Sequence, residues 1–171
     1  MMTTIFRSSL ESKVGWTWRD EQDRSAVVDS NQWLWRISLQ EGTDEGQANA
    51  VWYVLGKTLA SGASNEWDLT ALSRTLFNAS VNQAFASVKA LYVINRKESA
   101  GNLIIGGAAT NPWPGPFSSA THTLRIVPGG VLLVVHPNAG WSVSTSAKNL
   151  KLAAESGSVT YDLILIGVKA G

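Results

Sequence analysis

Short apolar runs separated by turn-forming residues recur along most of this 171-residue sequence. In three runs large side chains stand at every second position: Trp16 and Trp18, Trp33 and Trp35, then Val51, Tyr53 and Leu55. Later runs are short and rich in β-branched or aromatic residues, namely VKALYVI, NLIIGG, TLRIV, VLLVV, NLKLAA and VTYDLILIG. Because successive side chains of a strand point to opposite faces, these patterns predict strands.

The segments between these runs contain glycine and proline, as in NPWPGP, PGG, NAG and SGS. These residues supply turn geometry and do not continue a strand. About ten short strands with turns at close intervals predict a mainly β, single-domain fold, an antiparallel β-sandwich of jelly-roll-like type. We expect residues 1–31 to form an N-terminal arm and residues 32–171 to form the sandwich, a size that suits one core.

Residues 68–88 are ambiguous. Helical spacing after a possible cap at Asp68 is shown by Leu69, Leu72, Leu76 and Phe77, and then again by Val81, Ala84, Phe85 and Val88. This spacing predicts one or two short helices. The alternative is an irregular connection whose apolar residues plug one end of the sandwich, and propensity does not decide between them.

Charge is nearly absent from one long segment. Between Ser99 and Ala147 the one formally charged side chain is Arg125, although 16% of the whole chain is charged. Since a free surface needs charge for solubility, this segment predicts a face that is covered by other copies or by a partner. Residues 1–45 carry about −3 and residues 46–171 about +4, but at physiological salt such attraction reaches only about 8 Å.

Several classes of function are excluded by composition. The chain has no cysteine, which removes thiolate chemistry, disulfides and sulfur-ligated zinc. Its net charge of +1 and its lack of a basic run argue against nucleic-acid and anionic-membrane partners. The start MMTTIFRSSLESK lacks the apolar core of a signal peptide, and no long apolar run occurs, so we expect the protein to be made and assembled in a cytoplasm.

Catalytic candidates are few. The histidines are His122 and His136, with no carboxylate near either in sequence, and Glu66 and Asp68 would project from one side of an extended segment. We interpret the histidines as structural and the carboxylates as a solvated strand edge or a helix cap. Neither a G-x-S-x-G elbow nor a P-loop is present. The sequence therefore predicts a non-enzymatic protein with no catalytic residue, no cofactor and no metal.

The chain contains eight tryptophans. Trp113 in NPWPGPF and Trp141 in NAGWSV have loop-like surroundings, which makes them candidates for exposed aromatic contacts that stack on sugar rings. The alternative is that most of the indoles are core residues or interface anchors, since each buries a large area.

The segment from about Gly42 to Gly167 contains EGTDEGQANAVWY, EWDLTAL, VKALYVINR, NLIIGGAATNPW, LRIVPGGVLLVVHPNAGW and SVTYDLILIG. In that order it resembles small proteins encoded among the virion genes of tailed bacteriophages and prophages. The resemblance implies a virion structural protein. Its possible roles are capsid decoration (cement), head-to-tail joining or a tail component.

Decoration is the role we expect, because a cement protein needs a compact β body and an extension that reaches its neighbours. The arm would hold its neighbours through the apolar anchors Ile5, Phe6, Leu10 and Val14. The expected partners are further copies of the chain, in a homo-oligomer such as a trimer at local threefold positions, and the major capsid protein or another virion protein. The rival hypothesis is a carbohydrate-binding receptor-recognition module that uses exposed tryptophans.

Overall fold

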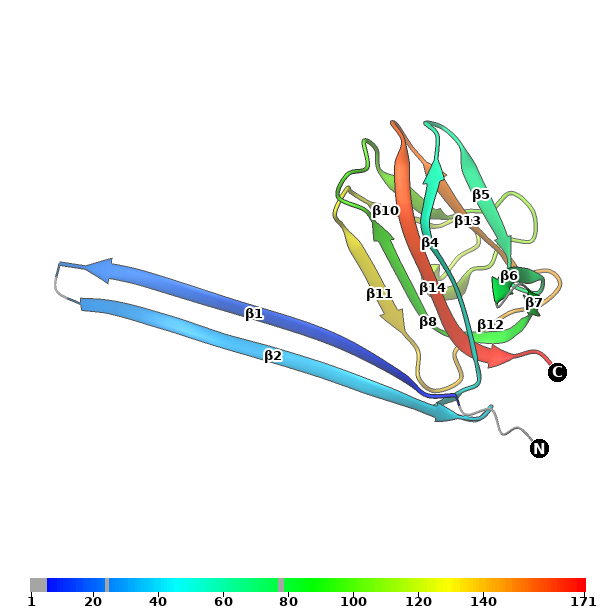
Figure 1. Cartoon of the computed structure of the whole chain (residues 1–171), viewed down its shortest axis with the longest axis horizontal. Coiled ribbons are helices and arrows are strands. Elements are labelled where there is room, and N and C mark those ends of the chain that lie inside the picture. The colour runs from blue at the N-terminus through cyan, green and yellow to red at the C-terminus, as the bar shows by residue number, and fades with distance from the viewer. Residues whose placement is uncertain (1–5, 24, 77–78) are drawn as a thin grey trace.

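The computed structural model of this chain describes residues 6–23, 25–76 and 79–171. It is mainly β, with 64% strand and 2% helix, in several antiparallel sheets. Figure 1 shows a compact sandwich from which a long two-stranded hairpin projects. The predicted fold class is therefore confirmed.

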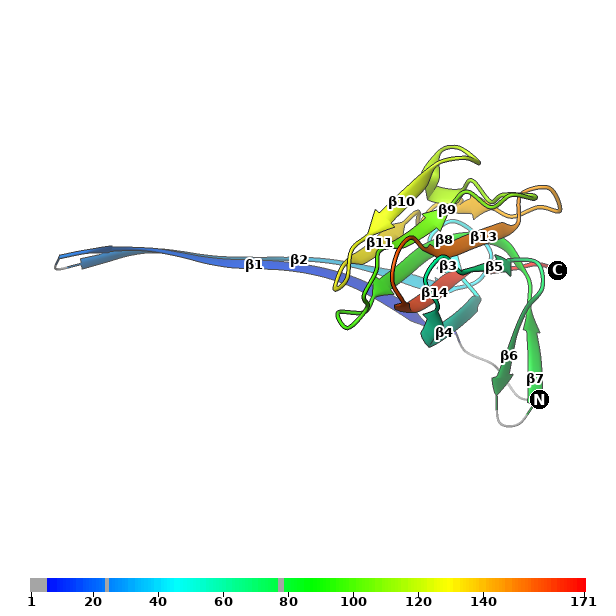
Figure 2. The same ribbon diagram turned by 90° about the horizontal axis from the view of Figure 1, so that it is seen from above.

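The compact body consists of two antiparallel sheets, which lie one above the other in Figure 2. The five-stranded sheet has the order β11-β8-β14-β4, with β12 added beside β8. Its strands are β4 (Ala50–Leu59), β8 (Phe85–Asn95), β11 (Val131–Val135), β12 (Trp141–Ser142) and β14 (Val159–Lys169). The four-stranded sheet has the order β10-β9-β13-β5. Its strands are β5 (Ser64–Asp68), β9 (Leu103–Gly106), β10 (Thr123–Ile126) and β13 (Asn149–Ala154).

The main core fills the space between these sheets. Trp52, Leu91 and Leu163 reach it from the five-stranded sheet, and Ile105 and Leu152 from the four-stranded sheet. Each is at most 2% exposed. Since burying one such side chain contributes roughly 1.5–3 kcal/mol, this core is the main source of stability.

A β-bulge interrupts the pairing of β4 with β14 between Tyr161 and Leu163. Opposite it, Gly56 has a φ of +65°, a conformation that favours glycine. The Gly56 amide donates to Asp162 Oδ1 at 2.6 Å, and Arg96 donates to the same carboxylate through Nε at 3.1 Å and Nη2 at 2.8 Å. Burial alone would raise the pKa of Asp162, but the hydrogen bonds from Arg96 and Gly56 outweigh it and hold that pKa below its ordinary value.

The helices predicted within residues 68–88 are wrong. Strands β6 (Leu72–Leu76) and β7 (Ala79–Gln83) form a two-stranded sheet, and β8 follows. Asp68 caps a turn instead of a helix, because its Oδ1 accepts from the Thr70 amide at 2.9 Å and its carbonyl accepts from the Ala71 amide at 3.0 Å. Serine, threonine and asparagine in this stretch also disfavour a helix.

The apolar residues of that stretch nevertheless reach the main core, since Leu69, Leu72 and Phe85 are at most 2% exposed. Phe77, which was part of the helical pattern, lies outside the described residues. In the part of the chain that the structure describes, helix is restricted to a 3-10 turn, η1 (Gly115–Phe117).

The projecting hairpin is formed by β1 (Ser8–Gln22) and β2 (Ser25–Glu41), and the short β3 (Gln47–Ala48) pairs with β2 in parallel. At about 3.3 Å per residue, its strands of 15 and 17 residues reach roughly 50 Å. The arm boundary expected at residue 31 falls inside β2, because the second strand pairs with β1 from Ser25 to Leu39.

The root of the hairpin is held by a buried lysine. Lys89 of β8 is 1% exposed, and its Nζ donates to the carbonyl oxygens of Asp44 at 2.7 Å and Asn138 at 2.5 Å. Burial lowers the pKa of Lys89, although Glu45 and Asp44 act in the opposite direction. The Gly46 amide also donates to the Pro137 carbonyl at 2.9 Å. The loop that follows β2 is therefore tied directly to the body.

Candidate interaction surface

The register of the hairpin collects its large apolar side chains on one face. Residues directly opposite each other in an antiparallel pair share a face, and here Val14 pairs with Trp33, Ser12 with Trp35, and Trp18 with Asp29. We call this side the apolar face of the hairpin. Its apolar members are Leu10, Val14, Trp16, Trp18, Val27, Trp33, Trp35, Ile37 and Leu39.

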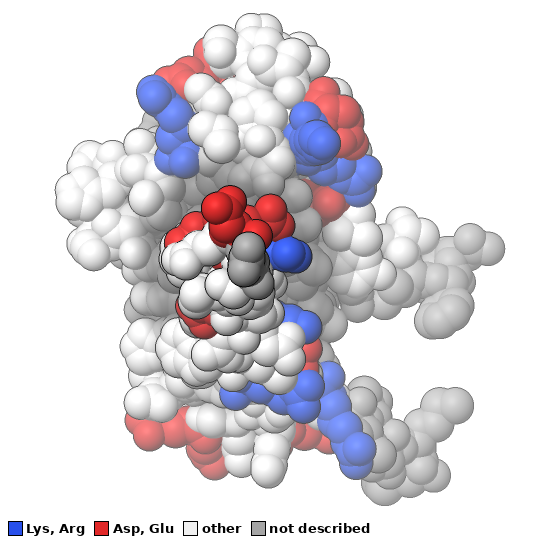
Figure 3. All heavy atoms as spheres, turned by 90° about the vertical axis from the view of Figure 1, so that its left-hand side faces the viewer, with Lys and Arg blue, Asp and Glu red and all other residues white. Residues whose placement is uncertain are grey.

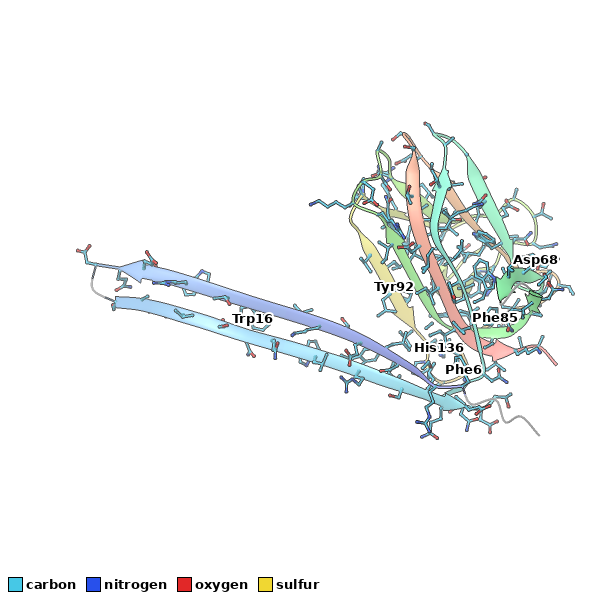
Figure 4. The ribbon with its side chains drawn as sticks, in the orientation of Figure 1. Phe6, Trp16, Asp68, Phe85, Tyr92 and His136 are labelled. Carbon is cyan, nitrogen blue, oxygen red and sulfur yellow. The ribbon has the colours of Figure 1, made fainter. Side chains whose placement is uncertain are left out.

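Most of the apolar face is open to solvent. Trp33 is 70% exposed, Trp18 58% and Trp16 46%. The Trp16 indole donates to Asp29 Oδ2 at 3.0 Å, so its polar atom is paired while its ring stays uncovered. Figure 4 shows Trp16 on the part of the hairpin that lies away from the body. With about 150–250 Å² per tryptophan, the uncovered parts of the indoles alone reach the few hundred Å² at which an exposed apolar patch is often functional.

The opposite face of the hairpin is mainly polar. Arg36 pairs with Glu11 across the strands, and the Thr17 and Ser30 hydroxyls lie 3.1 Å apart. Lys13, Arg19 and Gln32 belong to the same face by register. Figure 3 looks at the molecule from the hairpin tip and shows acidic side chains gathered there. The hairpin is thus amphipathic, with one face suited to water and the other to a partner.

At its base the apolar face already has a partner within the chain. Leu10 and Leu39 form a second hydrophobic cluster with Ala48 of β3 and Ala90 of β8. Partly buried side chains complete it: Phe6, Ile37, Leu133, Val135 and Ile166. The base of the hairpin therefore packs on the side of the five-stranded sheet that faces away from the main core.

That side of the sheet, which we call the outer face, is also apolar. The pairing of β11 and β14 with β8 brings together Val131, Leu133, Val135, Ala90, Tyr92, Ile94, Ile164 and Ile166. Antiparallel sheets commonly alternate an apolar inner face with a polar outer one, and this sheet departs from that pattern. Val131 is 56% exposed, while Tyr92, Ile94 and Ile164 are half-buried.

Three of the four arm anchors expected from the sequence lie in the described part of the chain. Leu10 is buried and Phe6 half-buried in the second cluster, whereas Val14 is 56% exposed on the apolar face. Ile5 lies outside the described residues. The exposed tryptophans of the hairpin were not among the expected contacts. Their alternation was visible in the sequence, but their common face depends on the register between β1 and β2.

Trp113 is not an exposed aromatic contact. It is 1% exposed, and its Nε1 donates to the Ser142 carbonyl at 3.0 Å. Trp141 is half-buried, with its ring edge-on to those of Trp113 at 6.3 Å and His136 at 5.5 Å. The loop-like sequence around Trp113 hides a core residue, so no flat platform for a sugar ring is formed by this pair.

The charge-poor segment from Ser99 to Ala147 supplies β9 and β10 to one sheet and β11 and β12 to the other. Ile105 and Trp113 within it belong to the main core. Val131 and Leu133 contribute to the outer face. Low charge in this segment therefore reflects both core and outer face, and its cover by another copy stays a prediction.

Of the residues weighed for catalysis, the two histidines and Asp68 have structural contacts, while Glu66 stands two residues before Asp68 on β5, opposite Lys151 of β13. His122 Nδ1 lies 2.9 Å from the Phe117 carbonyl, and His136 Nδ1 accepts from the Gly140 amide at 3.3 Å. Lys148 Nζ lies 2.5 Å from Asp68 Oδ2. Burial would raise the pKa of Asp68, but hydrogen bonds from Lys148 and Thr70 lower it overall. Among the described residues, no group of three or more potential metal-ligating side chains is found.

No helix within the described ranges is both long enough and apolar enough to cross a membrane. No protein-family model matches this sequence, and no curated protein matches it either.

Proposed function

We propose that this chain is a non-enzymatic structural subunit of a bacteriophage virion, and that it acts as a capsid decoration protein. The observation that carries the proposal is the hairpin, which reaches roughly 50 Å and presents four exposed tryptophans on one open apolar face. A cement protein acts by contact, and an amphipathic arm that reaches beyond its own body supplies such contact.

Two further observations support this role. Tryptophan is enriched among the residues that dominate binding energy at interfaces, and here the indoles are concentrated on one face of an extended element. The order of motifs between Gly42 and Gly167 resembles that of virion proteins of tailed phages. The proposed partners are other copies of the chain and the major capsid protein, and the proposed location is the virion.

The proposal is tested by co-sedimentation of the full-length chain with empty shells assembled from the major capsid protein of the same phage genome. A variant with Trp18→Ser and Trp33→Ser changes the apolar face. A matched variant with Val28→Ser and Leu34→Ser changes apolar residues of the opposite face, which are about equally exposed. We expect the first variant to lose shell binding at least 30-fold, as for loss of about 2 kcal/mol at a hot spot, and the second to bind like the wild type.

Wild-type protein that leaves the shells unbound would contradict decoration, and so would equal binding by both variants. Tail tubes and connector rings from the same phage, used in place of shells, separate decoration from a tail or head-to-tail role. Glycan binding that is lost with Trp18 and Trp33 while shells remain unbound would favour the receptor-recognition hypothesis.

A further inference from the structure

Two apolar surfaces of this chain are open: the distal part of the hairpin's apolar face and the outer face of the five-stranded sheet. We propose that these surfaces are partners in trans, so that the hairpin of one copy packs its apolar face on the outer face of a second copy. The inference rests on the proposed function in one respect, namely that the hairpin is an assembly element.

The first argument is continuity with a contact that exists within the chain. At the hairpin base, Leu10 and Leu39 of the apolar face pack on Ala90 of the outer face, next to Leu133 and Ile166. The two surfaces are therefore already complementary where they meet. Towards the hairpin tip the same face continues through Val14 and Trp33, and towards the far end of the sheet the outer face continues through Ile94 and Val131.

The second argument is that the chain does not cover these surfaces itself. Figures 1 and 2 show the hairpin extending away from the sandwich. A groove of about 360 Å³ opens between the two, lined by Ser12, Trp33 and Trp35 from the hairpin and by Leu133, Val134 and Val135 from β11. Folding back over the sheet would require the hairpin root to move, and that root is fixed by Lys89 and by the second cluster.

The third argument is electrostatic. The ion pair between Arg36 and Glu11 lies on the opposite face of the hairpin and would stay in water. On the sheet, the one carboxylate in register with the outer-face residues of β14 is Asp162, and it is already paired with Arg96. Asp29, beside Trp18 on the apolar face, accepts from the Trp16 indole. Asp29 and Asp20 both stand at the distal end of the apolar face, so the contact would keep these two carboxylates at its edge, in water, because burying an unpaired charge is costly.

The fourth argument is area. At roughly 200 Å² per tryptophan side chain, the exposed parts of the four indoles on the hairpin amount to about 400 Å². Adding the aliphatic residues and the matching sheet area from each copy approaches the 1,200–2,000 Å² typical of a stable interface. One type of contact between copies thus covers both surfaces.

The test uses two full-length variants that each lose one side of the contact. The hairpin variant carries Trp18→Ser and Trp33→Ser. The sheet variant carries Ile94→Lys and Val131→Lys, a cross-strand pair that lies outside the second cluster. The control carries Val28→Ser and Leu34→Ser on the opposite face of the hairpin. Light scattering measures the mass of each protein at about 10 μM, where an interface of micromolar Kd is largely formed.

We expect the wild type and the control to form the same closed oligomer, and each single-surface variant to be a monomer. An equimolar mixture of the two variants should form a dimer, because one copy still has an intact hairpin and the other an intact sheet. Circular dichroism and Tm establish that both variants are folded. The chain has no cysteine, so a disulfide between copies gives an independent readout. Asn31→Cys is placed in the sheet variant, whose hairpin is intact, and Val131→Cys in the hairpin variant, whose sheet is intact.

A wild-type monomer would overturn the inference, as would a sheet variant that assembles while the hairpin variant does not. Shell binding separates this result from the proposed function. If a monomeric wild type binds shells through Trp18 and Trp33, decoration stands, and the proposed packing of one copy's hairpin on another copy's sheet is wrong. If the oligomer forms through the hairpin and the outer face but binds no shell, the contact between copies stands and decoration is wrong.

Discussion

Tryptophans of this chain have opposite roles that depend on exposure. Trp113 is 1% exposed and packs edge-on against Phe117 and Trp141, whereas Trp33 is 70% exposed on the hairpin. A buried indole contributes to the stability of the body, and an exposed one is available for association. Residue type alone does not separate these roles.

We predict that Trp113→Ala lowers the free energy of unfolding by about 3–5 kcal/mol, because it leaves a large cavity and removes the hydrogen bond to Ser142. Trp33→Ser should change the stability of the body by less than about 0.5 kcal/mol in the monomer. Urea unfolding of both variants checks this. Similar losses for the two would show that exposure is a poor guide to their roles.

The ion pair of Asp162 predicts a dependence of stability on acid. Because Arg96 and Gly56 hold the pKa of Asp162 below its value in the unfolded chain, about 3.9, the folded state binds fewer protons in this range. The stability that this carboxylate contributes is therefore present above about pH 4 and is lost as the pH falls through its folded pKa.

The corresponding variant is Asp162→Asn. Its Tm should lie below that of the wild type at pH 6, and the difference should shrink between pH 4 and pH 2 as the wild type loses its ion pair. Asp68, whose pKa is also lowered, is present in both proteins and cancels in the comparison. A difference that stays constant down to pH 2 would mean that the charge of Asp162 does not stabilise the fold.

At the scale of elements, the hairpin is divided into a base and a distal part. The base is packed through Leu10 and Leu39 and is tied to the body at Lys89. The distal part pairs only with itself along β1 and β2 in the described structure. A two-stranded hairpin alone is marginally stable in water, so a partner for its apolar face would also stabilise the hairpin.

We predict that the distal hairpin is dispensable for folding. Replacing residues 15–32 by Asn-Gly, a turn that joins adjacent antiparallel strands, keeps Leu10, Ile37 and Leu39 in the second cluster. The Tm of this shortened chain should stay within about 2–4 °C of the monomeric wild type, equivalent to about 1 kcal/mol at this size. Its oligomer should be lost. An unfolded shortened chain would contradict the division into base and distal part.

At the scale of the whole molecule, the open surfaces are apolar while charge is spread over the remainder. The acidic hairpin tip and the more basic body attract each other over only about 8 Å at 0.15 M salt. Association that depends on the apolar surfaces should therefore resist salt.

We predict that the mass of the oligomer in solution is the same in 0.1 M and in 1 M NaCl. High salt screens ion pairs but does not weaken the burial of apolar area. Light scattering at the two concentrations measures this. Dissociation in 1 M NaCl would point to an interface held by charge, which the exposed tryptophans do not provide.

The strands could be predicted from the sequence because alternation is a local property of an extended backbone. Trp16 and Trp18, or Trp33 and Trp35, lie on one face of a strand whatever that strand pairs with. Turn residues such as those in PGG and NAG marked the ends of strands for a similarly local reason. The mainly β fold followed from these patterns.

The tertiary structure decided what local pattern could not. The register that pairs Val14 with Trp33 brings two strands' tryptophans onto one face, and this depends on residues up to 31 positions apart. Packing buried Trp113 despite its loop-like surroundings, and it drew Leu72 and Phe85 into the core from strands where their spacing had indicated a helix. Contacts between distant segments decide which side chains are buried and which share a face of a sheet, so the interaction surface could be identified only in the folded structure.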